Sequence, residues 1–391
     1  MTLFKEIEYR QRIDLARERM SEAAIEVLVV SDPANMNYLT GYDGWSFYTP
    51  QCLVLAVEEA TPLWIGRGMD AAGARHTTFL PEELIIGYPD RYVHSPHRHP
   101  LNFVGDVIRE RGWGTRSIGV EMDAYYFTAR SFAELQNSLP DARFVTADLL
   151  VNWIRLIKSE AEIEVMRQAG QIANRVMTTA LDRLEPGVRE CDVVADVYRA
   201  QMSGTPEYGG DYPAIVPMMP TGEKTSAPHL TWTDEPYQSE QMVNLELAAC
   251  RHRYHCPIAR TAYLGKRPPA PLVELASHTV EGLNLTLAAI RPGLRAEEVE
   301  LVWRNHIAKA GLEKESRIGY SMGLNYPPDW GEHTVSLRPG DTTVLQPNMT
   351  FHMILGMWMD TYGFECSEAF RVTDKGCETF ADVPRKLFVK G

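Results

Sequence analysis

The chain contains one short pattern twice, a helix that stops at Pro-Gly and is followed at once by a second helix. The first copy, at 185–201, reads EPGVRECDVVADVYRAQ, and the second, at 291–307, reads RPGLRAEEVELVWRNHI. An internal repeat predicts two similar halves of helices and strands, packed about a pseudo-twofold axis with a cleft between their sheets. The alternative is a chance match, because Pro-Gly junctions at helix ends are common.

The repeat lies in the second of two expected domains. Ser159 and Glu162 have the spacing of a capping box at the start of a long helix, and the residues that follow keep helical spacing as far as Leu184. We place the domain boundary just before this helix, which gives a first domain of residues 1–157 and a second of residues 158–391. A chain of 391 residues is long enough to form a core in each.

The first domain is expected to have an α/β fold. Residues 25–32 (IEVLVVSD) are apolar on both faces, as in a buried strand of a parallel sheet, and residues 52–57 and 61–66 have the pattern of a strand pair. Helix and strand patterns then alternate twice before residue 150. The predicted fold class is therefore an α/β N-terminal domain followed by an α+β domain with an internal pseudo-twofold repeat.

Composition excludes several classes of partner. The net charge of −13 leaves no basic surface for phosphates, so nucleic acid is not expected. No apolar run approaches the length of a membrane span, and the charged N-terminus lacks the apolar core of a signal peptide. Six thinly spread cysteines do not make a disulfide framework. We therefore expect a cytoplasmic protein that does not act at a membrane.

The stretch from Met242 to Gly265 has the pattern of two consecutive strands, with a carboxylate in the middle of the first. Alternation puts three apolar residues on one face of that strand, and Asn244 and Glu246 on the other. Burying an ionised carboxylate is costly unless it has a partner. Glu246 therefore either faces a polar pocket or belongs to a structural ion pair.

Several segments carry a resemblance to a known family. They are the helix start RLIKSEAEIEVMRQAG, the two Pro-Gly junctions, SAPH at 226–229, ARTAYLG at 259–265 and the terminal GFECSEAFRVTDKG. These segments resemble the pita-bread family, which contains creatinase, prolidase, aminopeptidase P and methionine aminopeptidase. The likeness covers the whole chain, because creatinase and prolidase carry an N-terminal α/β domain of this size with a segment like NMNYLTGYDG. It implies a pita-bread fold for residues 158–391.

The metallopeptidases of this family bind two metal ions through two Asp, one His and two Glu. The resemblance places other residues at these positions, namely Glu246, Pro257, Tyr320, Ile354 and Ser367. Proline and isoleucine side chains have no donor atom, and a single possible ligand cannot hold a divalent pair. The histidine-rich loop 94–100 and the cluster of Cys250, His252, His255 and Cys256 do not have the geometry of a metal site either. We therefore expect no metal and no cofactor.

The resemblance to creatinase implies that an enzyme with this fold can hydrolyse a C–N bond of a cationic substrate without metal, using a histidine and carboxylates. His229 in SAPH matches the catalytic or substrate-binding histidine of the family, although a lone histidine is more often structural. In this interpretation Glu246 is either the nucleophile or the base that activates water, and His229 carries protons to the leaving nitrogen.

The segments NYLTGYDGWSFY and GYSMGLNYPPDWGEHT, with the Glu246 strand, are similar to the ectoine-hydrolysing members of the family. This resemblance implies opening of the cyclic amidine ring of ectoine to N-acetyl-2,4-diaminobutyrate. Aromatic faces and carboxylates suit such a delocalised cation. Among the expected substrate-binding residues, the Trp and Phe side chains are equally compatible with core positions, and His255, His352 and Glu365 are at least as compatible with a structural role. The full set is Tyr42, Asp43, Trp45, Phe47, Tyr320, Asp329, Trp330, Glu332, His255, His352 and Glu365. Arg260 and Arg317 are candidates for binding the substrate carboxylate.

The resemblance to creatinase also implies a homodimer in which the N-terminal domain of one subunit covers the pocket of the other. Two other functions remain open. One is a creatinase-like amidinohydrolase acting on another small amidino or guanidino compound. The other is a pita-bread protein that has lost catalysis and only binds a partner.

Overall fold

The computed structural model describes residues 2–391, which form two compact units. The first unit ends at Arg155 and the second begins at Leu156. Within the described residues, no helix is both long enough and apolar enough to cross a membrane.

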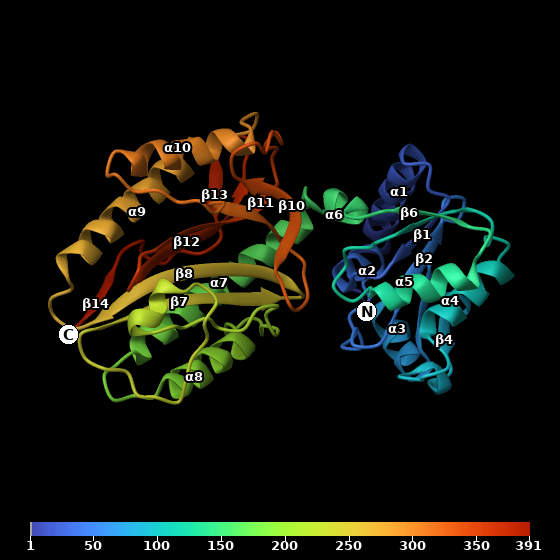
Figure 1. Ribbon diagram of the computed structural model, residues 1–391, viewed down its shortest axis with the longest axis horizontal. Helices are drawn as coiled ribbons and strands as arrows, with labels where there is room; N and C mark the ends of the chain where they lie inside the picture. The colour runs from blue at the N-terminus through green and yellow to red at the C-terminus, as the bar shows by residue number, and fades with distance from the viewer. Residues whose placement is uncertain (1) are drawn as a thin grey trace. The chain divides into compact units, whose positions relative to one another are not determined.

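The first unit is built on one six-stranded sheet with the strand order β4-β3-β2-β1-β5-β6 (Figure 1). The strands are β1 (Val27–Val30), β2 (Cys52–Ala56), β3 (Leu63–Arg67), β4 (Ile85–Tyr88), β5 (Ser117–Val120) and β6 (Arg143–Thr146). Parallel pairing joins β1 to β5 and β5 to β6, whereas β2 is antiparallel to both of its neighbours. The helices are α1 (Glu6–Glu22), α2 (Pro33–Thr40), α3 (Ala71–Thr77), α4 (Pro100–Glu110), α5 (Ala129–Ser138) and α6 (Leu150–Arg155), with short 3-10 turns at Gly68–Asp70, Glu82–Leu84 and Asp90–Tyr92. The predicted α/β fold of the first domain is confirmed.

The second unit combines two sheets with four long helices. One sheet has the order β10-β9-β11-β12-β13 and the other the order β14-β8-β7. The strands are β7 (Gln241–Arg251), β8 (Tyr254–Leu264), β9 (Gly319–Met322), β10 (Gly331–Leu337), β11 (Thr350–Trp358), β12 (Gly363–Val372), β13 (Cys377–Thr379) and β14 (Phe388–Lys390). The helices are α7 (Glu160–Arg183), α8 (Glu190–Ser203), α9 (Ala270–Ala289) and α10 (Ala296–Ala308), with the 3-10 helix η4 (Gly222–Ser226) between α8 and β7.

The internal repeat is visible in the backbone of the two Pro-Gly junctions. Gly187 has a φ of 91° and Gly293 a φ of 89°, a left-handed conformation that glycine adopts without steric cost. The Gly187 N–H donates to the carbonyl of Tyr237 at 2.8 Å, and the Gly293 N–H donates to that of Leu345 at 2.9 Å. Each junction is therefore followed by a helix and tied to a later segment in the same way, which confirms the predicted two-halved α+β domain.

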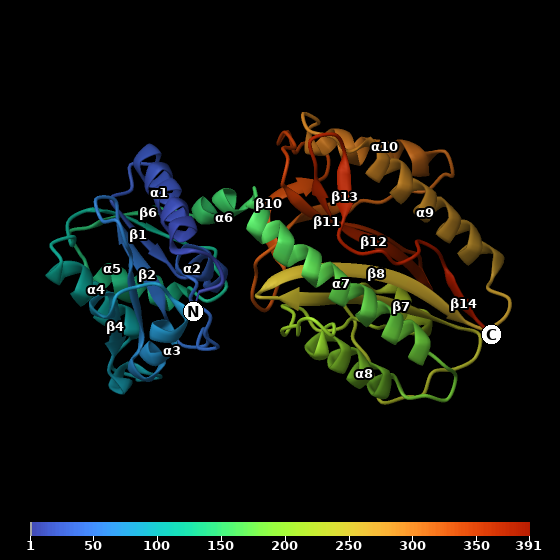
Figure 2. The ribbon, with the colours of Figure 1, turned by 180° about the vertical axis from the view of Figure 1, so that it is seen from behind.

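The helices of the second unit cover its sheets. Figures 1 and 2 show α8 along one side of the strands and α9 with α10 along the other. Apolar residues of α9 and α10, among them Leu283 and Trp303, pack on Phe351 of β11 and Phe364 of β12 in one core cluster. The predicted capping box of α7 is present. Ser159 Oγ accepts the Glu162 N–H at 3.2 Å, and the Glu162 carboxylate accepts the Ser159 N–H at 2.8 Å.

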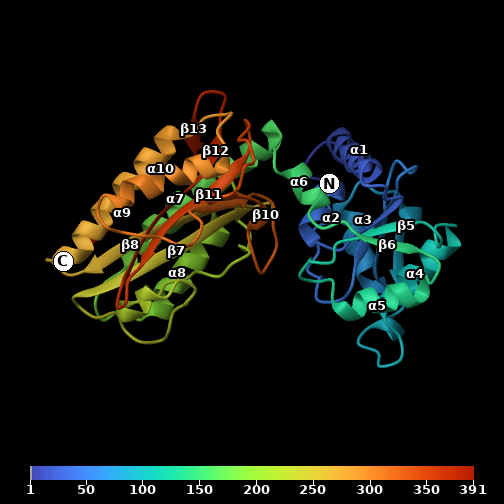
Figure 3. The ribbon, with the colours of Figure 1, turned by 45° about the horizontal axis from the view of Figure 1, so that its top comes forward.

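The two sheets of the second unit meet along β8 and β12, which run side by side in Figures 1 and 3. Side chains bridge the two strands. Ala259 of β8 donates its N–H to Ser367 Oγ at 2.6 Å, and the N–H of Glu365 donates to Thr261 Oγ1 at 2.8 Å. This junction brings the polar face of β7, which pairs with β8, next to polar residues of β12.

Candidate active site

Two buried carboxylates, those of Glu246 and Glu365, lie close together in the second unit. Glu246 is in the middle of β7 with 7% of its surface exposed, and Glu365 is in β12 with 2% exposed. Burial raises the pKa of Glu246 well above its ordinary value, and the charge of Glu365 raises it further. Burial also raises the pKa of Glu365 to about 7. Because two like charges disfavour each other in a buried site, one of the two carboxyls keeps a proton at neutral pH.

Hydrogen bonds between β7, β8 and β12 hold this pair in place. Thr261 Oγ1 donates to Asn244 Oδ1 at 2.8 Å while it accepts the N–H of Glu365. The Asn244 amide nitrogen lies 3.5 Å from Glu365 Oε1. The second carboxylate oxygen of Glu365, Oε2, is buried and has no hydrogen-bond partner among residues 2–391. An unsatisfied buried carboxylate oxygen is costly, so this oxygen is available to a ligand.

A chain of hydrogen bonds runs beside the two carboxylates. The Trp330 indole N–H donates to the Tyr320 hydroxyl oxygen at 2.7 Å, which lies 3.0 Å from His352 Nδ1. His352 Nε2 in turn lies 2.8 Å from Ser367 Oγ. Burial and the nearby Arg317 lower the pKa of His352 to about 3, so the ring is neutral at pH 7. A neutral ring donates through one nitrogen and accepts through the other, so the chain has two possible directions.

The charge of Glu246 also acts on this chain. Burial raises the pKa of Tyr320 strongly, and the charge of Glu246 is the next largest cause. The Tyr320 hydroxyl therefore stays protonated and lies within electrostatic reach of the carboxylate. In one direction of the chain, Tyr320 accepts from both Trp330 and His352, and its own hydrogen is then free to point toward the acidic groups.

One basic side chain influences Glu365 from a distance. Burial lowers the pKa of Lys314 to about 8, and the charge of Glu365 partly opposes this. The Lys314 ammonium donates to the carbonyl of Gly356 at 2.7 Å and lies 4.5 Å from the centre of the Trp358 ring. Among residues 2–391, no lysine or arginine forms an ion pair with Glu246 or Glu365. Of the two interpretations of Glu246, the arrangement therefore favours a polar site over a structural ion pair.

His255 and Glu332 already have protein partners. His255 Nε2 accepts the N–H of Ala214 at 2.8 Å, and Nδ1 lies 3.4 Å from the carbonyl of Gly323. The Glu332 carboxylate forms a buried ion pair with Lys158, with 2.7 Å between Oε1 and Nζ. Both side chains lie in the second unit and are occupied by these contacts.

Asp329 and Trp330 lie on the loop before β10. Burial opposes ionisation of Asp329, but hydrogen bonds from His333 and the Gly331 N–H outweigh it and lower the pKa of the carboxyl. Trp330 is buried, and its ring centre lies 6.2 Å from that of His352. The loop therefore brings an ionised carboxylate and an aromatic ring to the neighbourhood of the hydrogen-bonded chain.

The two arginines considered for the substrate carboxylate differ in their partners. Arg260 is fully buried and donates to Glu368 at 2.6 Å, and to the carbonyls of Ser367 and Val383, also at 2.6 Å. Arg317 is half-buried, lies over the Tyr320 ring at 4.4 Å and makes one 3.0 Å hydrogen bond to Ser336 Oγ. Arg317 therefore keeps donors for a ligand, whereas Arg260 ties strands together.

His229 is exposed, on the turn that follows η4. Thr225, four residues earlier, accepts through its carbonyl from Asn244 at 3.3 Å, and its hydroxyl accepts the N–H of Gly363 at 3.2 Å. The structure thus ties the residue just before the SAPH segment to the residues around Glu365. Within residues 2–391, no hydrogen bond joins His229 to Glu246.

The four predicted residues of the first unit lie on one loop. Tyr42 is buried, and its hydroxyl lies 2.9 Å from Ser46 Oγ and from Gln51 Oε1. Asp43 is exposed, and Phe47 is buried against Trp45, with 4.8 Å between the ring centres. Trp45 itself is 58% exposed.

Sequence reasoning missed Lys314, Asn244 and Thr261 as parts of the site. The available signal was the alternation of polar residues along otherwise apolar strands, which places Asn244 on the same face as Glu246. Thr261 stands directly opposite Asn244 in the β7–β8 pairing. Lys314 lies in the segment before β9, and no sequence pattern links that segment to β12.

The donor set does not fit the two metal ions that related metallopeptidases use. Ile354 pairs with Ser367 across β11 and β12, and Pro257 pairs with Ala248 across β8 and β7. Isoleucine and proline side chains offer no ligand atom at two of the positions. The hydroxyls of Tyr320 and Ser367 are already hydrogen-bonded to His352. Two carboxylates alone do not provide the four or more protein ligands that such a pair needs.

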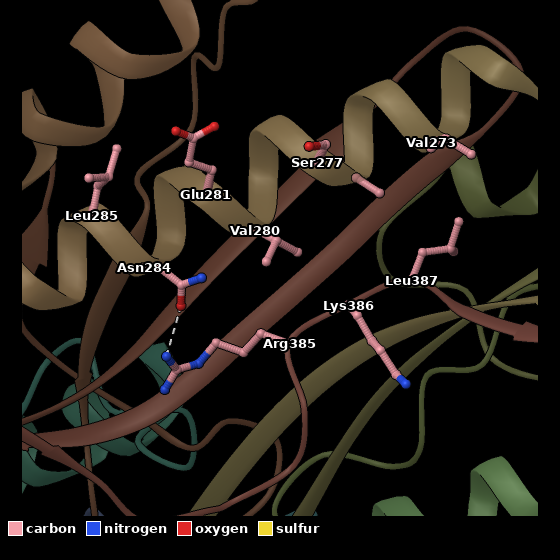
Figure 4. A pocket seen from close by; sticks show the side chains of 10 residues that line it. Val273, Ser277, Val280, Glu281, Asn284, Leu285, Arg385, Lys386 and Leu387 are labelled. Atoms are coloured by element: carbon pink, nitrogen blue, oxygen red, sulfur yellow. Dashed lines mark hydrogen bonds between the residues drawn. The ribbon is translucent and has the colours of Figure 1, made fainter.

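Two further cavities lie away from Glu246 and Glu365 and are lined by other residues. One of about 550 Å³ lies between α9 and residues 385–387, where Asn284 accepts a 2.9 Å hydrogen bond from Arg385 (Figure 4). Another of about 300 Å³ is lined by the histidine-rich loop 94–100 in the first unit.

Two family models match the chain. Residues 164–374 match Metallopeptidase family M24, and residues 12–157 match the Creatinase/Prolidase N-terminal domain. The chain is 45% identical to the ectoine hydrolase of Halomonas elongata over 394 residues, which cover 99% of this chain and 98% of that protein. It is 48% identical to an uncharacterized hydrolase/peptidase of Sinorhizobium fredii over 387 residues, which again cover 99% and 98%.

Solved structures share the fold. The dipeptidase PepE from Mycobacterium ulcerans aligns with a TM-score of 0.81 at 21% identity, covering 99% of both chains. The prolidase from Thermococcus sibiricus aligns with a TM-score of 0.83 at 17% identity, covering 98% of this chain and all of that one. These likenesses extend over both units, and the fold is the predicted pita-bread architecture with a creatinase-type N-terminal domain.

Proposed function

The chain belongs to the M24 family of creatinase- and prolidase-like hydrolases, and we propose that it opens the ring of ectoine, a small cyclic amidine, by hydrolysis to N-acetyl-2,4-diaminobutyrate. The observation that carries the proposal is the buried pair of Glu246 and Glu365, which no lysine or arginine of residues 2–391 neutralises through an ion pair. The amidinium ring of ectoine supplies the missing positive charge. The high identity with a relative named ectoine hydrolase supports this substrate.

Charge balance explains why a cation binds here. Without substrate, burial and mutual repulsion keep a proton on one of the two carboxyls. An amidinium beside Glu246 favours the ionised carboxylate, so substrate binding releases that proton and readies the group for reaction. A neutral analogue of the same shape lacks the attraction between the amidinium and the carboxylate, so it should bind more weakly.

The reaction adds one water across the amidine. Glu246 either attacks the amidine carbon, so that a ring C–N bond breaks and an O-acyl imidate forms, or removes a proton from the water that attacks this carbon. On the first route water then attacks the same carbon and releases Glu246, so on both routes the water oxygen becomes the amide oxygen. One ring C–N bond breaks, and the leaving nitrogen takes up a proton to become an amine.

Tyr320 is the proposed hydrogen-bond donor to the reacting centre. If Ser367 donates to His352 Nε2, then His352 Nδ1–H donates to Tyr320, which also accepts from Trp330. Ser367 is satisfied in this arrangement because it accepts the N–H of Ala259. The Tyr320 hydrogen is then free to donate to the oxygen that attacks the amidine carbon, or to the Glu246 carboxylate as its negative charge returns.

The remaining substrate contacts follow from charge. Arg317, which lies over the Tyr320 ring, is the proposed partner of the substrate carboxylate. Trp330 and Asp329 flank the same region and suit the ring cation. His229 keeps the proposed role of proton carrier to the leaving nitrogen, since its segment is anchored beside Glu365 through Thr225.

We further propose that the reaction proceeds without metal and in a homodimer. The donor set around Glu246 supports the first point, because it does not suit a divalent pair. The loop that holds Trp45 and Tyr48, both exposed, is the part of the first unit that we propose the partner subunit covers. Sedimentation of the active protein tests the dimer, and full activity in a monomer contradicts it.

The decisive experiment follows ectoine by proton NMR after incubation with chelator-treated protein. The proposal expects acetyl signals of the opened product to appear at an undiminished rate. Glu246→Gln should lower turnover at least ~10³-fold, since a glutamine neither attacks nor accepts a proton. Glu313→Gln, at an exposed position just before Lys314, is the matched control and should retain normal turnover.

A second substrate class is favoured by the same observation, because a guanidinium also matches two buried carboxylates. A panel of ectoine, creatine and other small amidino compounds separates the two. Turnover of a guanidino compound with none of ectoine would replace the ectoine proposal by a creatinase-like one. Absence of turnover on every member of the panel contradicts both.

A further inference from the structure

We propose that helices α9 and α10 form a binding site for one Zn²⁺ ion, held by His278, Glu281 and His306. Ligand atoms of these three side chains all lie within 4.8 Å of one another. Within residues 2–391, no other group of three or more histidine, cysteine or acidic side chains has all its ligand atoms this close together. The site lies on the outer helices of the second unit and does not depend on the proposed hydrolase function.

The helix pair brings the three ligands together. His278 and Glu281 are three residues apart on α9, so they are neighbours on one face of that helix. His306 comes from α10, near its end. The two imidazole ring centres are 6.3 Å apart.

A glycine allows the helices to approach at this point. A Cβ atom built on Gly282, inside α9, would lie 2.9 Å from His306 Cδ2 and 2.4 Å from Trp303 Cζ3. A side chain here would collide with the rings of Trp303 and His306, so the glycine permits the close contact between α9 and α10. Glycine is a poor residue for a helix interior, so its presence reflects the close contact.

Small side-chain rotations complete a metal shell. In a tetrahedral zinc site, metal–ligand bonds of about 2.0–2.2 Å place the ligand atoms about 3.4 Å from one another. The three side chains need to close from at most 4.8 Å to this separation. Glu281 is exposed and both histidines are half-buried, so each has room to rotate.

Existing contacts do not block the site. His306 Nε2 lies 3.0 Å from the carbonyl of His278, and His278 Nε2 lies 3.9 Å from Glu274. Binding through His306 Nε2 replaces a single hydrogen bond with a metal–nitrogen bond, whereas binding through Nδ1 retains it. Figure 4 shows the Glu281 carboxylate on the other side of α9 from the hydrogen bond between Asn284 and Arg385. Glu281 is therefore not drawn into that contact.

The ligand types select zinc. Two imidazoles and one carboxylate suit Zn²⁺, with water in the fourth position, whereas Ca²⁺ and Mg²⁺ prefer shells made of oxygen atoms. Bound zinc would connect α9 to α10. The consequence is a stabilised helix pair on the outside of the catalytic unit.

Calorimetric titration of ZnCl₂ into chelator-treated, full-length protein tests the site. We expect one ion per chain, a higher midpoint of thermal unfolding with zinc, and no comparable effect of MgCl₂. His278→Ala and His306→Ala should each weaken zinc binding at least ~10-fold, as expected for removal of one of three ligands. His94→Ala, in the histidine-rich loop of the first unit, is the control and should bind zinc normally.

Several outcomes would overturn the proposal. Unchanged zinc affinity in both histidine variants places the ion elsewhere, and sulfur ligands in the X-ray absorption spectrum assign it to cysteines. His278 is the safer position if His306→Ala unfolds, because its side chain is one-third exposed. Ectoine turnover of the His278→Ala protein is measured in parallel, so that failure of zinc binding and failure of the proposed hydrolysis remain separate results.

Discussion

Two regions of the second unit bury glutamates in opposite ways. Glu332 pairs with Lys158 at 2.7 Å, and both side chains are almost fully buried. Glu368 likewise pairs with Arg260 at 2.6 Å. Glu246 instead shares its surroundings with a second carboxylate, and burial and repulsion raise its pKa.

The contrast separates carboxylates that have a structural ion-pair partner from the pair that we propose as reactive. A buried ion pair with satisfied hydrogen bonds holds elements together, here the segment before α7 and strand β10. Two buried acids repel each other when both are ionised, and groups whose pKa is shifted by burial and like charge cluster at functional sites. We therefore assign the first kind to the framework and the second to the candidate active site.

The largest effect on stability should come from breaking the buried ion pair between Lys158 and Glu332. Lys158→Met removes the lysine from the buried ion pair with Glu332, and we expect the free energy of unfolding to fall by about 3–5 kcal/mol. Urea denaturation measures this. Arg189→Met, which removes an exposed pair with Asp192, is the control and should cost less than about 1 kcal/mol. Equal losses in the two variants would contradict the contrast.

The next largest effect should be a change in the free energy of unfolding with pH, caused by ionisation of Glu365. The pKa of Glu365 is about 7 in the folded protein, against an ordinary value of 4.5, so the folded state holds the proton more tightly. Protonated Glu365 therefore stabilises the folded state. This contribution is fully present below pH 4.5 and is lost as the pH rises to about 7. The loss is at most about 3 kcal/mol. Lys314, with a pKa of about 8, titrates mainly above this window.

Glu365→Gln sharpens this prediction. The variant lacks the titrating group, so its free energy of unfolding should change less between pH 4.5 and pH 7 than that of the natural protein. Urea denaturation at several pH values gives both curves. Parallel curves would mean that Glu365 does not titrate in this range.

Tyr320→Phe tests the hydrogen-bonded chain beside the acid pair. Loss of the hydroxyl removes the proposed donor, and we expect kcat for ectoine to fall about 10²-fold with a smaller change in KM. Tyr237→Phe is the matched control, because the Tyr237 hydroxyl is buried and has no hydrogen-bond partner among residues 2–391. A Tyr320→Phe protein with normal kcat would remove this donor from the mechanism.

The smallest effect should be that of Glu246→Gln on stability. Replacing one of two like-charged groups relieves repulsion, so the free energy of unfolding should stay the same or rise by about 1 kcal/mol. The same variant is expected to lose turnover, which makes function and stability change independently. A stability loss of more than about 2 kcal/mol would place Glu246 with the framework glutamates.

Local sequence patterns determined much of the architecture. The Pro-Gly junctions, the Ser159 capping box and the apolar strand at 25–32 predicted the two-halved second domain, the start of α7 and the α/β first domain. The residues that form each of these patterns stand close together in the sequence, so the patterns can be recognised from spacing alone. Alternation also put Asn244 and Glu246 on one face of β7.

Only the tertiary structure decided which partner each buried glutamate has. Glu246 and Glu332 both lie in strands, and nothing near them in the sequence shows which of the two has a basic partner. Lys158 reaches Glu332 from 174 residues away, whereas Glu365 reaches Glu246 because β8 and β12 meet. A strand pattern fixes the face of a side chain, but its neighbour comes from packing of distant segments, and that neighbour sets the charge of the site.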